Sequence, residues 1–170
     1  MSAVTPLHQV KAMTHVSLVV KDIFQTMDDY WNIFGIGPWD VYDWKYPNLR
    51  DRVYHGKPAW AWEKIAHTKV GPVGLELAQT VSGDSIYQDY INEHGEGIHH
   101  LSFDVDDMAE TERKLAPFPV LQSASGGADM KHAWSYIYSD IKPLGCIWEP
   151  VWVSGDLIGH NIKYPDLKGC

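Results

Sequence analysis

Two stretches of the chain carry the same alternation of apolar and polar residues. Residues 13–23 and residues 98–108 align without a gap, so that His15 corresponds to His100. Every second residue of each stretch is apolar, which is typical of a strand that packs one side against a core. The opposite side of each predicted strand carries the histidine and a serine two residues later. A gapless internal repeat of this kind predicts a duplicated supersecondary unit.

Both predicted strands lead into the same helix-start pattern. Asp22 and Asp107 are each followed three residues later by Gln or Glu. This is the spacing of a capping box, in which side chains bind the free amide groups at the start of a helix. Helices are therefore predicted directly after the two aspartates, at residues 23–34 and 108–116.

The remaining alternation predicts three further strands in each half of the chain. They lie at residues 39–44, 59–69 and 73–80 in the first half, and at residues 120–125, 134–139 and 145–153 in the second. Residues 45–58 are rich in Pro, Asn, Arg and Asp and are predicted to form a loop, which is either a lid or wall of a site or an exposed connection. A short helix is predicted at residues 85–94. The order strand, helix, strand, strand, strand thus occurs twice.

These elements divide the chain into five segments. They are an N-terminal lead-in at 1–12, a first βαβββ module at 13–81, a connecting helix at 82–97, a second βαβββ module at 98–153, and a C-terminal tail at 154–170 that wraps the domain or a partner. A length of 170 residues with 45% hydrophobic content suits one domain, or two half-domains that share a core.

Each module ends in a strand with a glutamate among apolar residues. These are Glu76 and Glu149. A buried carboxylate is unfavourable unless it is paired or binds a metal. If the modules pair about a pseudo-twofold axis, both glutamates converge with His15 and His100. Two imidazoles and two carboxylates suit Zn, Mn, Co, Ni or Fe(II). A structural histidine and an exposed strand glutamate are the commoner outcomes for each residue alone, and their coincidence at matched positions of a repeat favours a metal.

The other histidines lack a partner in the repeat. His99 is expected on the face of its strand opposite His100, in a supporting or packing role. The rest are assigned to the surface or to pocket walls: His55, His67, His94, His132 and His160.

Composition narrows the class of protein further. A net charge of −8 argues against a nucleic-acid partner, which would require a basic surface. No run of about eighteen apolar residues predicts a membrane span, and the N-terminus lacks the pattern of a secretory signal, so a cytoplasmic location is expected. Cys146 and Cys170 are predicted to be a buried thiol and a tail thiol. The eight Trp and nine Tyr fill a core, or some of them line a pocket.

Residues 95–107, Gly95-Glu-Gly-Ile-His-His-Leu-Ser-Phe-Asp-Val-Asp-Asp107, resemble a known family. The pattern is similar to the vicinal oxygen chelate superfamily, which includes glyoxalases, bleomycin resistance proteins and dioxygenases. This stretch is most similar to methylmalonyl-CoA epimerases and related glyoxalase-like proteins. The resemblance covers residues 11–153 and implies an α+β fold with paired βαβββ modules, a cupped mixed sheet and one divalent metal ion in the cup. A homodimer is also expected.

The resemblance implies specific ligands. His15, His100 and Glu149 match ligand positions of the family, whereas Glu76 matches a position held by Gln in epimerases and by Glu in glyoxalase I. The full set of metal ligands expected from the repeat and the resemblance is His15, Glu76, His100 and Glu149.

The implied activity is that of a metal-dependent epimerase or isomerase. It would abstract a proton α to a carbonyl or carboxylate and stabilise the resulting enolate on the metal. Glu149 is the candidate ligand and base together. Glu63 is a candidate second base, against the alternative of a solvated strand charge, and His67 lies on the same strand face as a further candidate acid or base.

Three alternatives stay open at this point. A glyoxalase-I-like lyase and an Fe(II) extradiol-type dioxygenase share parts of the ligand set, although a fourth protein ligand, Glu76, would occupy space that oxygen and catechol need. A non-catalytic small-molecule-binding protein of the same fold is the third. The expected substrate is a small-molecule acid or an acyl thioester. An aromatic or hydrophobic acid would be accommodated by tryptophans of the first module, namely Trp39, Trp44, Trp60 and Trp62.

Overall fold

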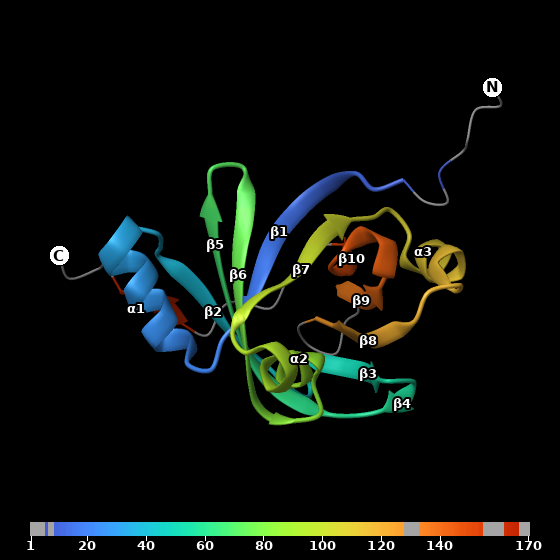
Figure 1. Ribbon diagram of the computed structural model, residues 1–170, viewed down its shortest axis with the longest axis horizontal. Coiled ribbons are helices and arrows are strands. Elements are labelled where there is room, and N and C mark those ends of the chain that lie inside the picture. Colours follow the sequence, from blue (N-terminus) through green and yellow to red (C-terminus); the bar gives the residue numbers. More distant parts are fainter. Residues whose placement is uncertain (1–5, 7–8, 128–132, 155–161, 167–170) are drawn as a thin grey trace.

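The computed structural model describes residue 6, residues 9–127, residues 133–154 and residues 162–166. Within these residues, one mixed sheet of eleven strands forms the body of the molecule, in the order β11-β2-β5-β6-β1-β7-β10-β9-β8-β3-β4 (Figure 1). The predicted α+β class is confirmed. Of the helices in the described part of the chain, none is long and apolar enough to cross a membrane.

The elements follow the predicted order with additions. The first half contains β1 (Ala12–Val19), α1 (Ile23–Phe34), β2 (Trp39–Trp44), β3 (Leu49–Tyr54), β4 (Lys57–Pro58), β5 (Ala61–Val70) and β6 (Val73–Gly83). After α2 (Ile86–His94), the second half contains β7 (Gly97–Asp104), α3 (Met108–Leu115), β8 (Val120–Gly126), β9 (Trp134–Asp140), a 3₁₀ turn (Lys142–Leu144) and β10 (Ile147–Val153). The strand β11 (Ile162–Tyr164) follows.

The sheet is built from two equivalent halves that meet at its centre. β1 and β7 are adjacent and antiparallel. β6 runs parallel to β1, and β10 runs parallel to β7. Outward from these strands, β5 and β2 continue the first half, while β9 and β8 continue the second. The predicted pairing of two βαβββ modules in one mixed sheet is therefore confirmed, and α1 and α3 lie at opposite sides of the molecule (Figure 1).

The prediction of a loop at residues 45–58 is wrong. This segment contains β3 and β4, and β3 pairs with β8 at the edge of the second module. Two features hide the strand in the sequence. Asp51 has a positive φ of 50° and interrupts the register between Arg50 and Val53, so the alternation is broken by an irregularity. Arg52, which looks like a solvent-facing residue, is 5% exposed because it pairs with a buried carboxylate, Glu63.

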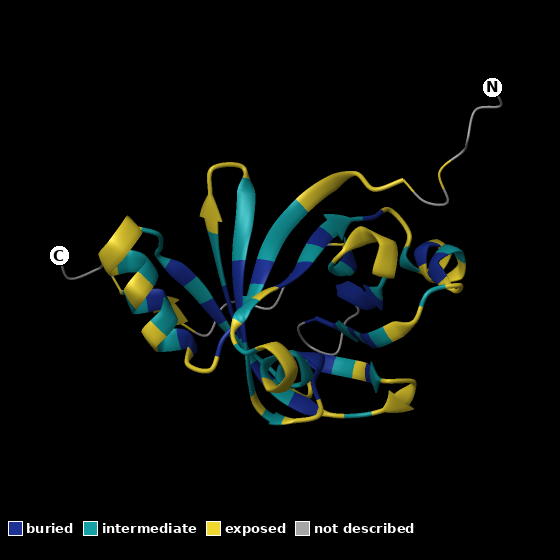
Figure 2. Ribbon diagram, in the orientation of Figure 1, coloured by how far each residue is buried: buried dark blue, intermediate teal, exposed yellow. Residues whose placement is uncertain are grey.

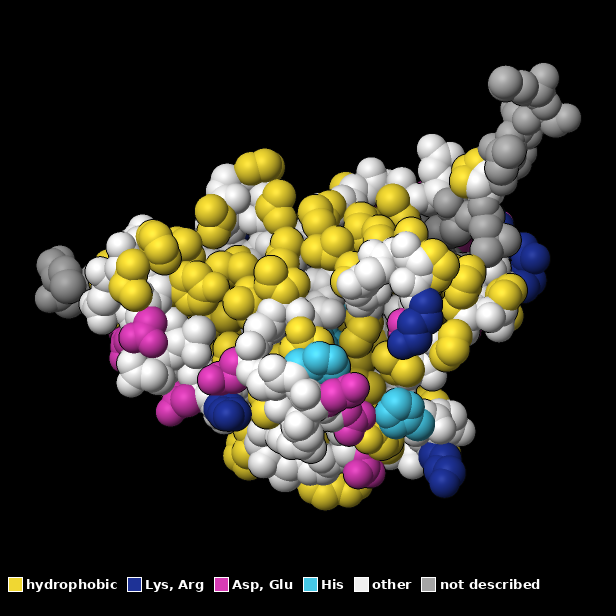
Figure 3. Space-filling model, viewed as in Figure 1, with side chains coloured by type: hydrophobic (Ala, Val, Ile, Leu, Met, Phe, Trp, Pro, Cys, Tyr) yellow, Lys and Arg dark blue, Asp and Glu magenta, His cyan; other side chains and the backbone are white. Residues whose placement is uncertain are grey.

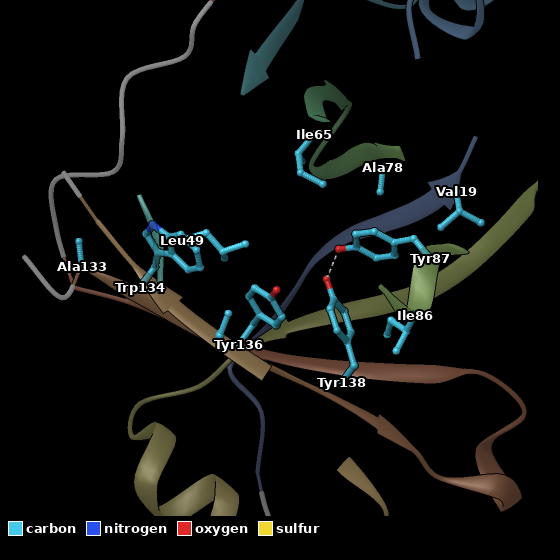
Figure 4. Packing of buried hydrophobic residues seen from close by; sticks show 11 residues of the cluster. Val19, Leu49, Ile65, Ala78, Ile86, Tyr87, Ala133, Trp134, Tyr136 and Tyr138 are labelled. Atoms are coloured by element: carbon cyan, nitrogen blue, oxygen red, sulfur yellow. Dashed lines mark hydrogen bonds between the residues drawn. The ribbon is translucent and has the colours of Figure 1, made fainter. Parts of the chain in front are cut away.

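Both faces of the central strands are buried. Val20 packs with Ile23 and Met27 of α1 on the outer face, whereas Val19 packs with Tyr87 and Tyr138 on the inner face (Figure 4). Figure 2 shows that buried residues gather where the central strands meet. The side of β1 that the sequence marked as polar is thus an interior surface, because the second half of the sheet and α2 close over it.

Two aspartates cap the N-terminal ends of α1 and α3. Asp22 accepts from the amides of Phe24 and Gln25, and Asp107 accepts from that of Glu110, so both aspartates cap their helices as predicted. The reciprocal halves of the capping boxes are replaced by side-chain pairs further along the helix, Gln25 with Asp29 and Glu110 with Lys114.

Of the C-terminal tail, residues 162–164 add β11 to β2 of this chain. Tyr164 stacks edge-on against Phe24 and donates to Asp28 of α1. Cys146 lies just before β10 and is half-buried, which differs from the predicted buried strand thiol, and Cys170 lies outside the described residues.

Candidate metal centre

The register of the four central strands brings the predicted site residues together. Ser17 on β1 is opposite Glu76 on β6 and opposite His100 on β7. Ser102, two residues after His100, is opposite both His15 on β1 and Glu149 on β10. The histidines therefore come from the two middle strands and the glutamates from the two flanking strands. Each module contributes one of each, as the repeat predicted.

The ligand atoms of His15, Glu76 and His100 all lie within 4.8 Å of one another, and Glu149 adjoins the two imidazoles. The Nε2 atoms of His15 and His100 are 3.3 Å apart. Oε2 of Glu149 lies 3.1 Å from His15 Nε2 and 3.3 Å from His100 Nε2. The oxygens of Glu76 lie 3.6 Å from His15 Nε2 and 3.5 Å from His100 Nε2. Atoms that bind one divalent ion tetrahedrally at 2.0–2.2 Å lie roughly 3.3–3.6 Å from each other, so the spacing of each glutamate from the two imidazoles fits a shared ion.

The donor set also fits a metal better than it fits a hydrogen-bonded cluster. Two imidazole nitrogens that face each other can share at most one proton between them. Oε2 of Glu149 is buried and has no hydrogen bond of proper geometry within the described residues, although both imidazoles lie beside it. A buried carboxylate oxygen without a donor is rare in proteins, and a cation shared with the imidazoles would bind it.

The remaining ring nitrogens of the histidines are engaged away from the centre. His15 Nδ1 lies 3.3 Å from the Thr14 hydroxyl, and His100 Nδ1 lies 2.9 Å from Nδ1 of His99. Such outer contacts fix the orientation of a ligating imidazole and select the tautomer that leaves Nε2 free for the metal.

The electrostatic state of the cluster reflects two buried acids beside histidines. Burial disfavours charge on His15, but Glu76 and Glu149 override this and raise its pKa to about 9. Burial also opposes charge on Glu76, yet His15, His67 and His100 lower its pKa to about 2. The pKa of Glu149 is well below its ordinary value because His100 and His15 outweigh burial. Both carboxylates are therefore charged and require positive charge nearby, which protons supply in the absence of an ion.

The strand face expected for His99 is wrong, whereas its expected supporting contact with the site is present. The pairing of β1 with β7 shifts after Ser17, which is opposite His100, while Leu18 is opposite Ile98. His99 is the extra residue of this irregularity, so it does not alternate with His100 and instead contacts it directly. Burial and the adjacent His100 lower the pKa of His99 well below its ordinary value, so His99 is neutral. No pattern in the sequence marks the shift.

Glu63 does not occupy the position expected of a base or of a solvated charge. It is fully buried, and its two oxygens accept from the guanidinium of Arg52 at 2.8 and 3.0 Å. The Ser85 hydroxyl also donates to it at 2.6 Å. Arg52 further donates to Gln122 and to the carbonyl of Asp84, so this ion pair joins β3, β5, β8 and the start of α2. The structure thus gives Glu63 a structural position.

His67 lies at the site. Its Nε2 is 3.1 Å from Oε2 of Glu76, its direct neighbour across β5 and β6, and its ring stands edge-on to His15 at 5.4 Å. His67 is half-buried and lines a cavity. Glu63 and His67 therefore share the inward face of β5, although the two residues have different surroundings.

A cavity of about 300 Å³ opens onto the cluster. Its polar lining consists of Thr14, His15, His67 and Glu149. The remaining described lining residues are aromatic or aliphatic: Tyr42, Trp44, Trp134, Tyr136, Val151 and Val153.

Of the four tryptophans expected at the site, only Trp44 lines this cavity. Trp39 is buried beside α1, Trp60 is 66% exposed, and Trp62 donates to Asp43.

A second cavity, of about 700 Å³, lies at the other end of the strands beneath α2. It is lined by His55, Asp89, Glu93 and His94, among others, and Figure 3 shows histidine and acidic side chains over α2 and β3. Asp89 is engaged by Tyr54 and His55. His15, Glu76, His100 and Glu149 are not among its described lining residues, so the smaller cavity is the one attached to the candidate metal centre. His132 and His160 lie outside the described residues.

The fold and the geometry of the site define a vicinal-oxygen-chelate type of protein, and the comparisons with known proteins agree. The chain belongs to the glyoxalase/bleomycin resistance protein/dioxygenase superfamily, whose model matches residues 14–133. No curated protein matches the sequence.

Among solved structures, a hypothetical protein from Bacillus halodurans C-125 is similar with a TM-score of 0.62 and 17% identity, over 87% of this chain and 98% of that one. Methylmalonyl-CoA epimerase from Mycobacterium tuberculosis is similar with a TM-score of 0.58 and 16% identity, over 86% and 90%. A mutant 4-hydroxymandelate synthase from Streptomyces coelicolor has a TM-score of 0.52 and 13% identity, over 89% and 51%. These similarities establish the shared fold.

Proposed function

We propose that this protein is a divalent-metal-dependent epimerase or isomerase that removes a proton α to a carbonyl or carboxylate. The metal ligands are His15, Glu76, His100 and Glu149. The observation that carries the proposal is the mutual spacing of 3.1–3.6 Å between the imidazole nitrogens and the carboxylate oxygens.

The four residues suit a divalent ion of the Zn, Mn, Co, Ni or Fe(II) type. When bound, such an ion supplies a Lewis acid that stabilises negative charge developing on a substrate oxygen.

Glu149 is the proposed proton acceptor as well as a ligand. It lines the cavity and is ionised, and its Oε2 lies 3.1 Å from His15 Nε2 and 3.3 Å from His100 Nε2. An ionised carboxylate that faces the cavity can accept a proton from an adjacent carbon acid.

His67 is the proposed second proton-transfer group. Its ring lines the same cavity and is held by Glu76 at 3.1 Å. A ligand in the cavity would thus have Glu149 and His67 on different strands, β10 and β5, and a proton could leave to one and return from the other. A two-base epimerisation uses such a pair of groups.

Metal content and proton exchange test the proposal together. Protein purified without chelators should contain about one divalent ion per chain, and His100→Ala should lose it. His94→Ala is the matched control, because His94 is an exposed residue of α2 remote from the cluster. In deuterated water, 2-substituted malonates and their thioesters should gain deuterium at the α carbon without oxygen uptake. Absence of metal, or equal metal in His100→Ala, would contradict the proposal.

A second candidate function follows from the contacts of Glu76. Ser17 donates to its Oε1 at 2.6 Å, and His67 lies 3.1 Å from its Oε2. If these contacts hold Glu76 away from the ion, His15, His100 and Glu149 remain as two histidines and one carboxylate, the set used by Fe(II) oxygenases. Oxygen-dependent ring opening of a catechol by the iron-loaded protein would favour this function over epimerisation.

The identity of the metal, a small-molecule acid or an acyl thioester as substrate, and a homodimer are parts of this proposal. Methylmalonyl-CoA epimerase has been solved in complex with methylmalonyl-CoA, which makes that compound a natural first candidate.

A further inference from the structure

The cavity at the candidate metal centre has a lining with two distinct parts. His15, His67 and Glu149 form the polar part, where a chelating group would bind. The remainder is dominated by Tyr42 and Trp44 of β2 and by aromatic residues of β9. Among the described residues that line it, none is Lys or Arg, so this lining offers no cationic side chain to a phosphate group.

The aromatic residues form an ordered wall. Trp44 lies nearly parallel to Trp134, with ring centroids 4.7 Å apart and an interplanar angle of 18°. It also lies nearly parallel to Tyr136, at 6.2 Å and 16°. The rings of Trp134 and Tyr136 are also nearly parallel to each other, with an interplanar angle of 5°. Figure 4 shows both of them on β9, pointing toward the interior.

Burial separates the members of this wall. Trp134 is 4% exposed and Tyr136 is 1% exposed, whereas Trp44 is only half-buried. Trp44 covers the other two rings and retains surface of its own. It is therefore the ring of this wall on which a ligand can stack. Flat rings gain from stacking beyond the apolar area that they bury.

The size of the cavity limits the ligand. An apolar cavity of about 150 Å³ is sufficient to bind benzene. A cavity of about 300 Å³ accommodates one ring together with a small chelating group. Ligand cavities range from about 300 to 1,000 Å³, so this one is at the small end.

We infer that the ligand of this site is a compact aromatic acid, with one ring stacked on Trp44 and with carboxylate oxygens at the metal centre. The binding of the carboxylate oxygens at the metal centre rests on the proposed function. The stacking of the ring depends on the aromatic wall around Trp44. A coenzyme A thioester is the competing ligand. In that case only its acyl part would occupy the cavity.

Phenylmalonate and methylmalonate form a matched pair of probes. Both carry the same two carboxylates and the same type of α carbon, and they differ in a ring against a methyl group. Calorimetric titration of the metal-loaded protein should show phenylmalonate binding at least about tenfold more tightly than methylmalonate. Equal affinities, or tighter binding of methylmalonyl-CoA than of phenylmalonate, would overturn the inference.

Variants at Trp44 locate the effect. Trp44→Ala should reduce the preference for phenylmalonate over methylmalonate to within about twofold, whereas Trp44→Phe should retain most of the preference because it keeps a flat ring. Trp60→Ala is the control, since Trp60 is exposed and does not line this cavity. An unchanged preference in Trp44→Ala would contradict the inference, as would its loss in Trp60→Ala. Thermal melting and metal content confirm that the variants compared are folded.

The metal content separates failure of this inference from failure of the proposed function. If the protein binds metal but binds both malonates equally, the inference of an aromatic ligand is rejected and the proposed metal centre is retained. If the protein contains no metal but still prefers phenylmalonate, the proposed metal-dependent function is rejected and the inferred aromatic site is retained.

Discussion

Glu76 and Glu149 occupy equivalent positions in the two modules, but their surroundings differ. Oε1 of Glu76 accepts a hydrogen bond from Ser17 at 2.6 Å, and its Oε2 lies 3.1 Å from His67. In the second module, Ser102 is opposite Glu149, yet the Ser102 hydroxyl and Oε2 of Glu149 are both buried without a hydrogen bond among the described residues. Both carboxylates lie beside imidazoles, Glu149 at 3.1 Å from His15 and 3.3 Å from His100, so the difference between them is the serine hydroxyl that binds Glu76.

This difference assigns different tasks to equivalent residues. A carboxylate held by a hydroxyl and an imidazole is fixed in orientation, which suits a permanent metal ligand. Glu149 lines the cavity, where it can bind the ion and also accept a proton from a ligand. The symmetry of the fold supplies the positions, and the loss of symmetry among the neighbours would supply the chemistry.

The largest effect is expected for Glu149→Gln. The amide cannot accept the proton and is a poorer ligand, so α-proton exchange should fall by about a thousandfold. Exchange measured by NMR in deuterated water, with metal content determined on the same sample, provides the check. A loss of exchange no larger than that of Glu76→Gln would show that the asymmetry between the two carboxylates has no catalytic consequence.

The two modules also differ in the connection after their second strand, because only the first carries β3 and β4 there within the described residues. Arg52 of β3 is the partner of the fully buried Glu63. Arg52→Met would leave that carboxylate buried and unpaired, so the free energy of unfolding should fall by about 3 kcal/mol. Urea denaturation measures this change.

Arg113→Met is the matched control for Arg52, since Arg113 is an exposed residue of α3. Its expected change is within about 0.5 kcal/mol. Metal stoichiometry should be unchanged in both variants. A loss of metal in Arg52→Met, in protein that remains folded, would mean that β3 and β4 affect the metal centre as well as the stability of the fold.

A smaller effect is expected for Glu76→Gln. The amide oxygen can still accept from Ser17, but the negative charge is removed from the cluster, so metal affinity should fall by about 10- to 100-fold. Competition with a chelator of known affinity measures it. If Glu76 is not a ligand, as in the dioxygenase alternative, the affinity should change by much less, and Fe(II) with catechol becomes the decisive assay.

The comparison of the modules also shows what the sequence can and cannot predict. The gapless repeat predicted that His15, Glu76, His100 and Glu149 lie on four central strands, because strand alternation and symmetry are encoded locally. The position of His99 was missed, since the register shift beside Ser17 is a property of the pairing between two strands. β3 was missed for a related reason. The burial of Arg52 is stable only because its guanidinium binds the carboxylate of Glu63, which is also buried.

The smallest effect concerns the two equivalent serines and tests the asymmetry most directly. Ser17→Ala removes the hydrogen bond to the charged Glu76, and such bonds contribute about 1.5–3 kcal/mol. Part of this contribution should appear as weaker metal binding, by about three- to tenfold, because Glu76 loses its fixed orientation. Ser102→Ala should change metal affinity by less than about twofold, since the Ser102 hydroxyl has no hydrogen bond to lose in the described structure. Chelator competition on the two variants measures both values under one set of conditions. Equal losses would mean that Ser102 binds Glu149 in solution, and the two carboxylates would then be equivalent in surroundings as well as in position.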